Sequence, residues 1–278
     1  MGISELKSCI QRVEVKGVET RYFDDKQDAD PVLLIHGGHF GFFVPLGLES
    51  WGETIHDLGK YGRVLAVDKL GQGETALPLN DEDWTVNGVA EHMVNFIEML
   101  DLRNLTLVGH SRGGLTAMIV AFKIPDRVKK LVVVSSASAA PAPTTGSDMD
   151  FYNNVERTAP ADAAGLVQHY HAAQAVAEGP LPDDYVEIAA QMLESDKQQA
   201  AVASYNRNAE AHWIPSLAAA REDLQRKFRE TGIPVPTLLI WGVNDRSAPV
   251  ASGHLLFNMI TEKTKNSSMH LLNNAGHQ

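Results

Sequence analysis

The chain has 278 residues, of which 44% are hydrophobic and 21% charged, so it is long enough for one large domain or a domain with an insertion. Its 24 Lys and Arg against 35 Asp and Glu leave a formal net charge of -11, which disfavours nucleic acids and anionic membrane surfaces as partners. Cys9 is the only cysteine, so no intrachain disulfide can form. We find no secretion signal and no apolar run near the ~20 residues of a bilayer span, and we expect a soluble, reduced, cytoplasmic protein.

Short apolar segments typical of strands alternate with longer helical segments along most of the chain. This alternation predicts an α/β fold with a mostly parallel central sheet flanked by helices. In chain order we expect an antiparallel entry at 13–23, strands at 32–35, 63–67, 105–108, 131–134, 237–241 and 269–272, and helices near 48–60, 89–100 and 112–125. Asp83, Thr85 and Asn87 offer N-capping side chains for the second of these helices.

The alternation stops between residues 138 and 231. Pro141 to Gly146 read as a linker, and the segment after it is helical, rich in Ala and Gln, and without clear strands. We therefore predict a core formed by 1–137 and 232–278 with a helical cap at 138–231. The alternative is that these helices are ordinary covering helices of one α/β core.

The residues from Gly109 to Gly113 match the pattern G-x-S-x-G, with Ser111 at its centre. The pattern lies between an expected strand and an expected helix, where a sharp turn exposes a nucleophilic hydroxyl at a helix N-terminus. The alternative is a Gly-rich turn with an incidental serine. The context favours Ser111 as a nucleophile.

A serine nucleophile needs a base, an orienting carboxylate and donors for an oxyanion. Asp245 follows the expected strand at 237–241, and His277 follows the expected strand at 269–272, so both lie where sites gather in such sheets. We predict Asp245 as the acid and His277 as the base, although either residue alone would be better explained as an ordinary loop residue. His36-Gly37-Gly38 ends the expected strand at 32–35, and resemblance to serine hydrolases of this kind implies that the backbone amides of Gly38 and Arg112 are the two oxyanion donors. The alternative is a flexible turn in which His36 only packs.

The other histidines form no compact set with metal-ligand spacing, so we predict no metal site. His212, in the expected cap, is a candidate for the wall of the substrate pocket, but it is explained equally well as a polar helix residue. Trp51, Phe42 and Trp213 are further candidates for the substrate pocket, and each is at least as well explained by core packing.

The sequence resembles the meta-cleavage-product hydrolases, which are carbon–carbon bond hydrolases of the α/β-hydrolase fold that act on vinylogous diketones from aromatic-ring degradation. The resemblance covers most of the core and little of the cap, and rests on Val18–Tyr22, Leu34–Gly38, Ala66–Thr75, Val108–Ser111 and Trp241–Pro249. It implies a serine triad, an oxyanion hole, a helical lid and no cofactor. It also implies that histidine assists ketonisation of the dienol, that serine attacks the distal carbonyl, and that water releases the acyl group.

Arg112 departs from this family, which usually has Met or Leu after the nucleophile. The lid arginine that typically binds the substrate carboxylate has no clear counterpart here, since Met192 to Ser195 occupy its region, and Arg207 is an unaligned alternative. We hypothesise that the Arg112 side chain supplies the missing cation, because a guanidinium suits a carboxylate. The alternative is that the side chain points into solvent or surrounding structure.

The leading prediction is therefore a small-molecule hydrolase that cleaves a carbon–carbon bond in a 2-hydroxy-6-oxo-dienoate. An esterase or lactonase with the same triad, and a binding protein without activity, remain the alternatives. The oligomeric state stays open, a homo-oligomer included. The family continues beyond its histidine with a closing helix, whereas this sequence ends at Gln278, so it is either truncated or lacks that helix.

Overall fold

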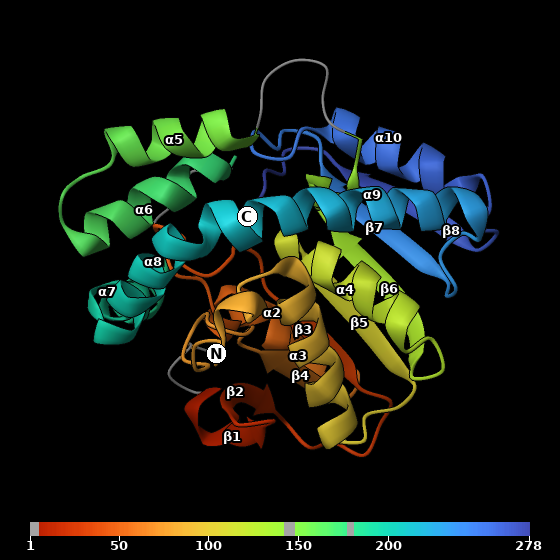
Figure 1. The fold of residues 1–278 in the computed structure, drawn as a ribbon, viewed down its shortest axis with the longest axis horizontal. Coiled ribbons are helices and arrows are strands. Elements are labelled where there is room, and N and C mark those ends of the chain that lie inside the picture. The colour runs from red at the N-terminus through yellow and green to blue at the C-terminus, as the bar shows by residue number, and fades with distance from the viewer. Residues whose placement is uncertain (1–5, 142–147, 177–180) are drawn as a thin grey trace.

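The computed structural model describes residues 6–141, 148–176 and 181–278. Its centre is an eight-stranded sheet in the order β1-β2-β4-β3-β5-β6-β7-β8 (Figure 1). The strands are β1 (Ile10–Val15), β2 (Val18–Asp24), β3 (Val32–Ile35), β4 (Val64–Val67), β5 (Leu105–His110), β6 (Val128–Val134), β7 (Thr237–Gly242) and β8 (Ser267–Leu272). Pairing is antiparallel from β1 to β2 and from β2 to β4, and parallel elsewhere. The predicted mostly parallel sheet is confirmed.

Successive side chains of a strand point to opposite faces of the sheet, and both faces are buried under the surrounding elements. In β3, Leu33 and Ile35 join the larger apolar core, while Leu34 joins the smaller one. The larger core contains residues of α3 (Val86–Met99), α4 (Arg112–Lys123), α9 (Ile214–Glu230) and α10 (Val250–Thr261), and the smaller one contains Ile55 of α2 (Gly52–Gly59). The sequence had not indicated α10.

Local chemistry explains where two of the predicted helices begin. The side chain of Thr85, one of the three expected capping residues, accepts a hydrogen bond from the Gly88 amide at 2.9 Å and caps α3. The predicted helix near 48–60 is instead a 3₁₀ turn, Leu48–Trp51, followed by α2. The Gly52 φ of 22° separates the two segments, and such a positive angle favours glycine.

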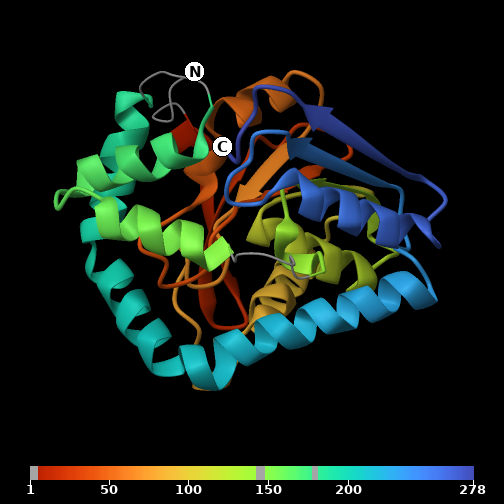
Figure 2. The same cartoon turned by 90° about the horizontal axis from the view of Figure 1, so that it is seen from above.

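Four helices form a group beside the sheet: α5 (Asp148–Thr158), α6 (Ala163–Gln174), α7 (Asp183–Glu194) and α8 (Asp196–Asn208). Figures 1 and 2 show this group at one end of the molecule, with α9 running from it back across the core. A π-helical turn, Ala209–Trp213, joins α8 to α9. Because Leu224 and Phe228 of α9 are buried in the main core, we propose that the cap ends at Trp213 and that α9 belongs to the core. The expected linker at 141–146 lies almost entirely outside the described residues.

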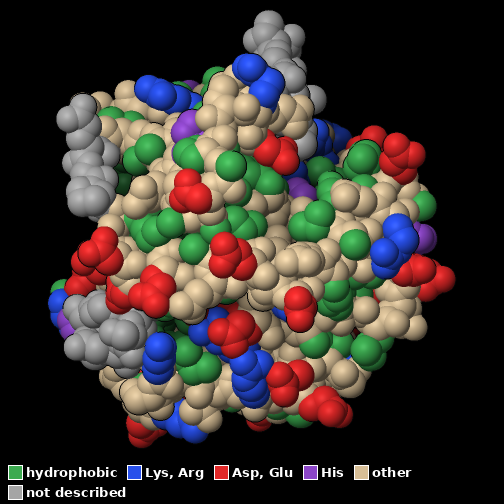
Figure 3. All heavy atoms as spheres, turned by 90° about the vertical axis from the view of Figure 1, so that its left-hand side faces the viewer, with side chains coloured by type: hydrophobic (Ala, Val, Ile, Leu, Met, Phe, Trp, Pro, Cys, Tyr) green, Lys and Arg blue, Asp and Glu red, His purple; other side chains and the backbone are tan. Residues whose placement is uncertain are grey.

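The face that carries the cap helices shows acidic and basic side chains interspersed with apolar ones (Figure 3). No broad basic area appears on this face, in keeping with the net charge of -11. Among the helices of the described residues, none has both the length and the apolar character needed to cross a bilayer.

Candidate active site

Ser111 occupies a strained turn between β5 and α4. Its φ of 52° and ψ of -123° lie outside the regions that residues with a side chain normally adopt. The turn is held by hydrogen bonds from the Ser111 amide to the Val134 carbonyl and from the Gly114 amide to the Ser111 carbonyl, both 2.9 Å. Because two bonds and the adjoining elements fix this backbone, the strain persists and places Ser111 at the N-terminus of α4.

The glycines of the motif are required by close backbone approach. A Cβ on Gly109 would lie 2.3 Å from the Gly113 carbonyl oxygen. A Cβ on Gly113 would lie 2.1 Å from the Ile35 carbonyl oxygen, on the neighbouring strand β3. These contacts explain why G-x-S-x-G is needed here, since any larger residue would push α4 away from the sheet.

His277 and Asp245 are joined by a hydrogen bond of 2.7 Å between His277 Nδ1 and Asp245 Oδ2, and both side chains are buried. Asp245 Oδ1 accepts from the amides of Ser247 (2.9 Å) and Ala248 (2.7 Å). The carboxylate is therefore held at both oxygens. An ionised carboxylate only accepts, so Nδ1 of His277 carries the proton and Nε2 is left as the acceptor.

The backbone of His277 is held from two sides. Its amide donates to the Gln174 carbonyl at the end of cap helix α6 (3.0 Å), and its carbonyl accepts from His110 Nε2 (2.7 Å). Because a carbonyl cannot donate, His110 must carry its proton on Nε2. Burial, together with the nearby His277, lowers the pKa of His110 to about 3, so His110 is neutral at ordinary pH. No local pattern in the sequence indicates this role for His110, because its partner His277 lies 167 residues away in the chain.

One pocket brings these groups together. Ser111, His277, Gly38 and Arg112 all line it, as does Phe42. Its volume is about 30 Å³, so the side chains that line the pocket leave little free space in this conformation.

Three of the expected pocket residues do not line this cavity. The Trp51 ring lies behind His110, with ring centroids 6.3 Å apart. Trp213 is buried against Phe40, with ring centroids 4.8 Å apart, and His212 lies beside it on the π-helical turn, partly exposed. Packing against the core therefore directs these three side chains away from the pocket.

Arg112 lies between the pocket and Trp213. Its guanidinium carbon is 5.9 Å from the centre of the Trp213 ring, a cation–π contact. In the ranges that the structure describes, no ion pair joins Arg112 to a carboxylate. Its charge adds to burial in lowering the pKa of nearby His39 to about 3, so His39 is neutral and the pocket keeps a cation at this wall.

The cap supplies pocket residues that the sequence did not indicate. Tyr152 of α5 and Tyr170 of α6 line the cavity, and Phe42 contacts both rings at centroid distances of 5.3 and 5.8 Å. Ala137 and Ser138 add the start of the segment that leads into the cap. A pattern search could not find these residues, because they converge only through the packing of the cap on the core.

Met192 and Ser195, in the region aligned with the lid arginine, line a different cavity between the cap and the first two strands. Among the described residues, no group of three or more His, Cys, Asp or Glu side chains is arranged to hold a metal ion.

Comparison with known proteins decides the family. The model of the alpha/beta hydrolase fold family matches residues 30–278. The chain belongs to this family. Among curated relatives, this α/β hydrolase is 25% identical over 261 residues to the 2-hydroxy-6-oxo-2,4-heptadienoate hydrolase of Pseudomonas putida, covering 94% of the chain and 87% of the relative.

A second relative supports the same branch. The 2-hydroxy-6-oxo-6-(2'-aminophenyl)hexa-2,4-dienoic acid hydrolase of Metapseudomonas resinovorans is 29% identical over 260 residues, covering 90% of this α/β hydrolase and 79% of the relative. Among solved structures, a serine hydrolase involved in carbazole degradation superposes with a TM-score of 0.71 at 23% identity, covering 96% of this chain and 91% of the other. The resemblance to the meta-cleavage-product hydrolases is confirmed, and the fold is confirmed with it.

Proposed function

We propose that this α/β hydrolase is a serine hydrolase that cleaves a carbon–carbon bond in a 2-hydroxy-6-oxo-dienoate. The observation that carries the proposal is the 2.7 Å hydrogen bond between His277 and Asp245 at the wall of a pocket that also contains Ser111. The curated relatives described above are named for hydrolysis of such dienoates, which supports this substrate class.

Each residue has a distinct role in this proposal. Ser111 is the nucleophile, and His277 Nε2 takes its proton because Nδ1 is already bound to Asp245. Asp245 orients the ring and stabilises the imidazolium that forms. The amides of Gly38 and Arg112 are the donors for the oxyanion, and loss of one such donor commonly costs about 10²- to 10³-fold in kcat.

The chemistry needs only water as a co-reactant. The 2-hydroxy group of the dienoate tautomerises to a ketone, and Ser111 Oγ adds to the C6 carbonyl to give a tetrahedral oxyanion. Ketonisation has already moved the hydroxyl proton to C5. Collapse of the tetrahedral oxyanion breaks the C5–C6 bond, and its electron pair passes into a dienolate whose C2 oxygen takes up the proton that His277 received from Ser111, so that a 2-hydroxydienoate leaves. Water, deprotonated by His277, then hydrolyses the acyl group from Ser111.

We propose further that the Arg112 side chain binds the substrate carboxylate. It stands at the pocket wall with the indole of Trp213 beneath it and no carboxylate partner in the described chain. A guanidinium in this state can form a bidentate pair with an incoming carboxylate, at a small desolvation cost because it is already partly buried.

The decisive experiment measures turnover of a panel of 2-hydroxy-6-oxo-dienoates and nitrophenyl esters by the wild type and by Ser111→Ala. Dienoate cleavage that is lost in Ser111→Ala is expected, and the fall in kcat should be about 10⁴- to 10⁶-fold, as for loss of other serine nucleophiles. Ester turnover without dienoate turnover would assign an esterase instead. No turnover of either would favour a binding role.

Arg112→Met tests the carboxylate contact separately, since methionine is close in length and leaves the backbone amide in place. We expect KM for a dienoate acid to rise about tenfold or more, because a charge-assisted hydrogen bond contributes roughly 1.5–3 kcal/mol. KM for a neutral nitrophenyl ester should change little. An equal effect on both substrates would contradict the assignment.

A further inference from the structure

The direction of the Gly38 amide is set by groups behind the pocket. In a trans peptide the carbonyl and the N–H point in opposite directions, so whatever holds the Gly37 carbonyl also aims the Gly38 N–H. His36 Nδ1 lies 2.8 Å from the Gly37 carbonyl oxygen, and His36 Nε2 accepts from the Lys69 amide at 3.2 Å. The two contacts require the tautomer with its proton on Nδ1, so His36 is the donor to Gly37.

The peptide on the other side of Gly38 is held by Lys69. Lys69 Nζ donates to the Gly38 carbonyl oxygen at 2.7 Å. Gly38 has a φ of +70°, in the region that glycine enters freely, and because it lacks a Cβ, either flanking peptide can rotate with little steric resistance. Lys69 is therefore the group that holds the second peptide in place.

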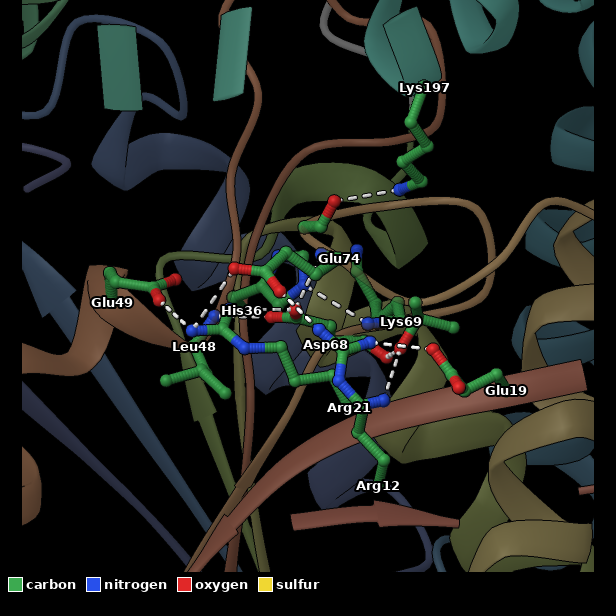
Figure 4. Close-up of polar contacts among 12 residues, drawn as sticks. Arg12, Glu19, Arg21, His36, Leu48, Glu49, Asp68, Lys69, Glu74 and Lys197 are labelled. Carbon is green, nitrogen blue, oxygen red and sulfur yellow. Dashed lines mark hydrogen bonds and ion pairs between the residues drawn. The ribbon is translucent and has the colours of Figure 1, made fainter. Parts of the chain in front are cut away.

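Burial of Lys69 carries a large desolvation cost. Lys69 is 1% exposed, and the described ranges contain no ion pair that neutralises it. Figure 4 shows Lys69 beside a cluster in which the adjacent Asp68 is already committed: one oxygen accepts from the Leu48 amide (2.7 Å) and the other from Arg21 (3.1 Å). Burial lowers the pKa of Lys69 well below its usual value, as expected for an ammonium without a counter-ion.

An apolar side chain of similar length would avoid this cost, since buried charges can often be replaced by hydrophobic residues without loss of stability. No ion pair among the described residues therefore offsets the cost of burying Lys69. Its one described side-chain hydrogen bond is to the carbonyl of the predicted oxyanion residue.

We propose that Lys69 is a positioning residue of the oxyanion hole, where its hydrogen bond to the Gly38 carbonyl holds the turn that presents the Gly38 amide to the reacting oxygen. This inference rests on the proposed serine chemistry. It does not depend on which substrate the enzyme uses, because every acyl transfer at Ser111 needs the same donors.

The test is Lys69→Met, measured by the rate at which a small alkyl fluorophosphonate labels Ser111. In this reaction Ser111 Oγ displaces fluoride from phosphorus, and the phosphoryl oxygen takes the place of the oxyanion. Misplacement of one donor by about 1 Å costs up to about 10²-fold, so we expect labelling to slow by about 10- to 100-fold. The melting temperature should stay the same or rise, because a buried amine without an ion pair among the described residues is removed.

Lys197→Met is the matched control. Lys197 of α8 also donates to a backbone carbonyl at 2.7 Å, but on Gly73 rather than on the turn at Gly38. Its loss should leave the labelling rate close to that of the wild type.

The possible outcomes separate a positioning role from a structural one, and both from failure of the proposed function. Labelling of folded Lys69→Met at the wild-type rate would overturn the positioning role alone. A fall in melting temperature together with the rate, or failure to fold, would show that Lys69 is structural and would also overturn it. A wild type that does not label at Ser111 at all would overturn the proposed function, and this inference with it.

Discussion

At the scale of single residues, the site depends on hydrogen bonds that assign protons. His277 Nδ1 faces an ionised acceptor, His110 Nε2 faces a carbonyl, and each contact permits only one tautomer. The catalytic proposal requires an unprotonated Nε2 on His277, and Asp245 provides it. Exchange of that single oxygen for a nitrogen therefore tests the arrangement without a change in shape.

Asp245→Asn should lower kcat by about 10⁴-fold with little loss of stability. The amides of Ser247 and Ala248 hold one oxygen of residue 245, so the new amide nitrogen would face His277 and donate to Nδ1. The proton of His277 would move to Nε2, which could then no longer accept from Ser111. Steady-state kinetics on whichever substrate the wild type turns over would measure the effect.

Asp223→Asn is the control for this experiment, because Asp223 pairs with Arg226 and Lys227 on α9, away from the pocket. It should retain wild-type kcat. Less than a tenfold loss in Asp245→Asn would show that His277 does not depend on this carboxylate.

At the scale of elements, the turn between β5 and α4 is the most constrained segment of the molecule. Ser111 adopts a positive φ, and the glycines on either side of it approach neighbouring backbone more closely than any Cβ would allow. The N-terminus of α4 is thus pressed against the carbonyl ends of β3, which is what brings Ser111 and the turn at Gly38 into one pocket.

Gly113→Ala should destabilise the protein by about 1–3 kcal/mol and abolish activity, because the new methyl would overlap the Ile35 carbonyl and force α4 to shift. Urea unfolding and Ser111 labelling would measure both effects. Gly59→Ala, in α2, is the matched control: its nearest neighbour is Asp25 Oδ2 at 3.5 Å, and alanine favours the helix, so stability should be unchanged or higher. If both variants were equally stable, the close approach would not constrain the turn.

At the scale of the whole molecule, buried histidines make the fold sensitive to acid. Burial lowers the pKa of His39 and His110 to about 3 and that of His92 and His171 to about 4. Their unfolded pKa is about 6.5, so below pH 6.5 the unfolded chain takes up protons that the folded chain does not bind. Each histidine then removes about 1.4 kcal/mol of stability per pH unit.

Asp68 opposes this loss of stability at low pH, because burial and the nearby Glu49 raise its pKa to about 6. Between about pH 4 and 6 the folded state binds the Asp68 proton more tightly than the unfolded chain does, so this carboxyl offsets roughly one histidine. The histidines outnumber it, and we expect the free energy of unfolding to fall steadily from pH 6.5 to 4.

His92→Leu tests this balance. His92 Nε2 lies 2.9 Å from Thr20 Oγ1 and its Nδ1 is buried without a partner, so its removal takes one titrating group from the core. The slope of unfolding free energy against pH, from urea titrations at pH 7, 5.5 and 4.5, should decrease by about 1.4 kcal/mol per pH unit. His254→Asn, at an exposed position, should leave the slope unchanged, and equal slopes in all three proteins would contradict the explanation.

The sequence by itself determined the order and type of most core elements and the motif around Ser111. The expected strand at 32–35 coincides with β3, and the helix expected from Arg112 is α4. Such features depend on residues that are near one another in the chain, where apolar spacing, glycine and capping side chains act directly. The sequence also placed Asp245 and His277 directly after strands. In a parallel sheet such positions lie at one edge, so their general location could be predicted.

The tertiary structure alone decided which side chains meet. Asp245 and His277 are 32 residues apart and are joined by a hydrogen bond, while Trp51, His212 and Trp213 pack outside the pocket that they were expected to line. Tyr152 and Tyr170 reach that pocket from the cap, and Lys69 reaches the Gly38 turn from the end of β4. These contacts join segments distant in sequence, and their geometry is set by how the layers pack, for which local spacing carries no signal.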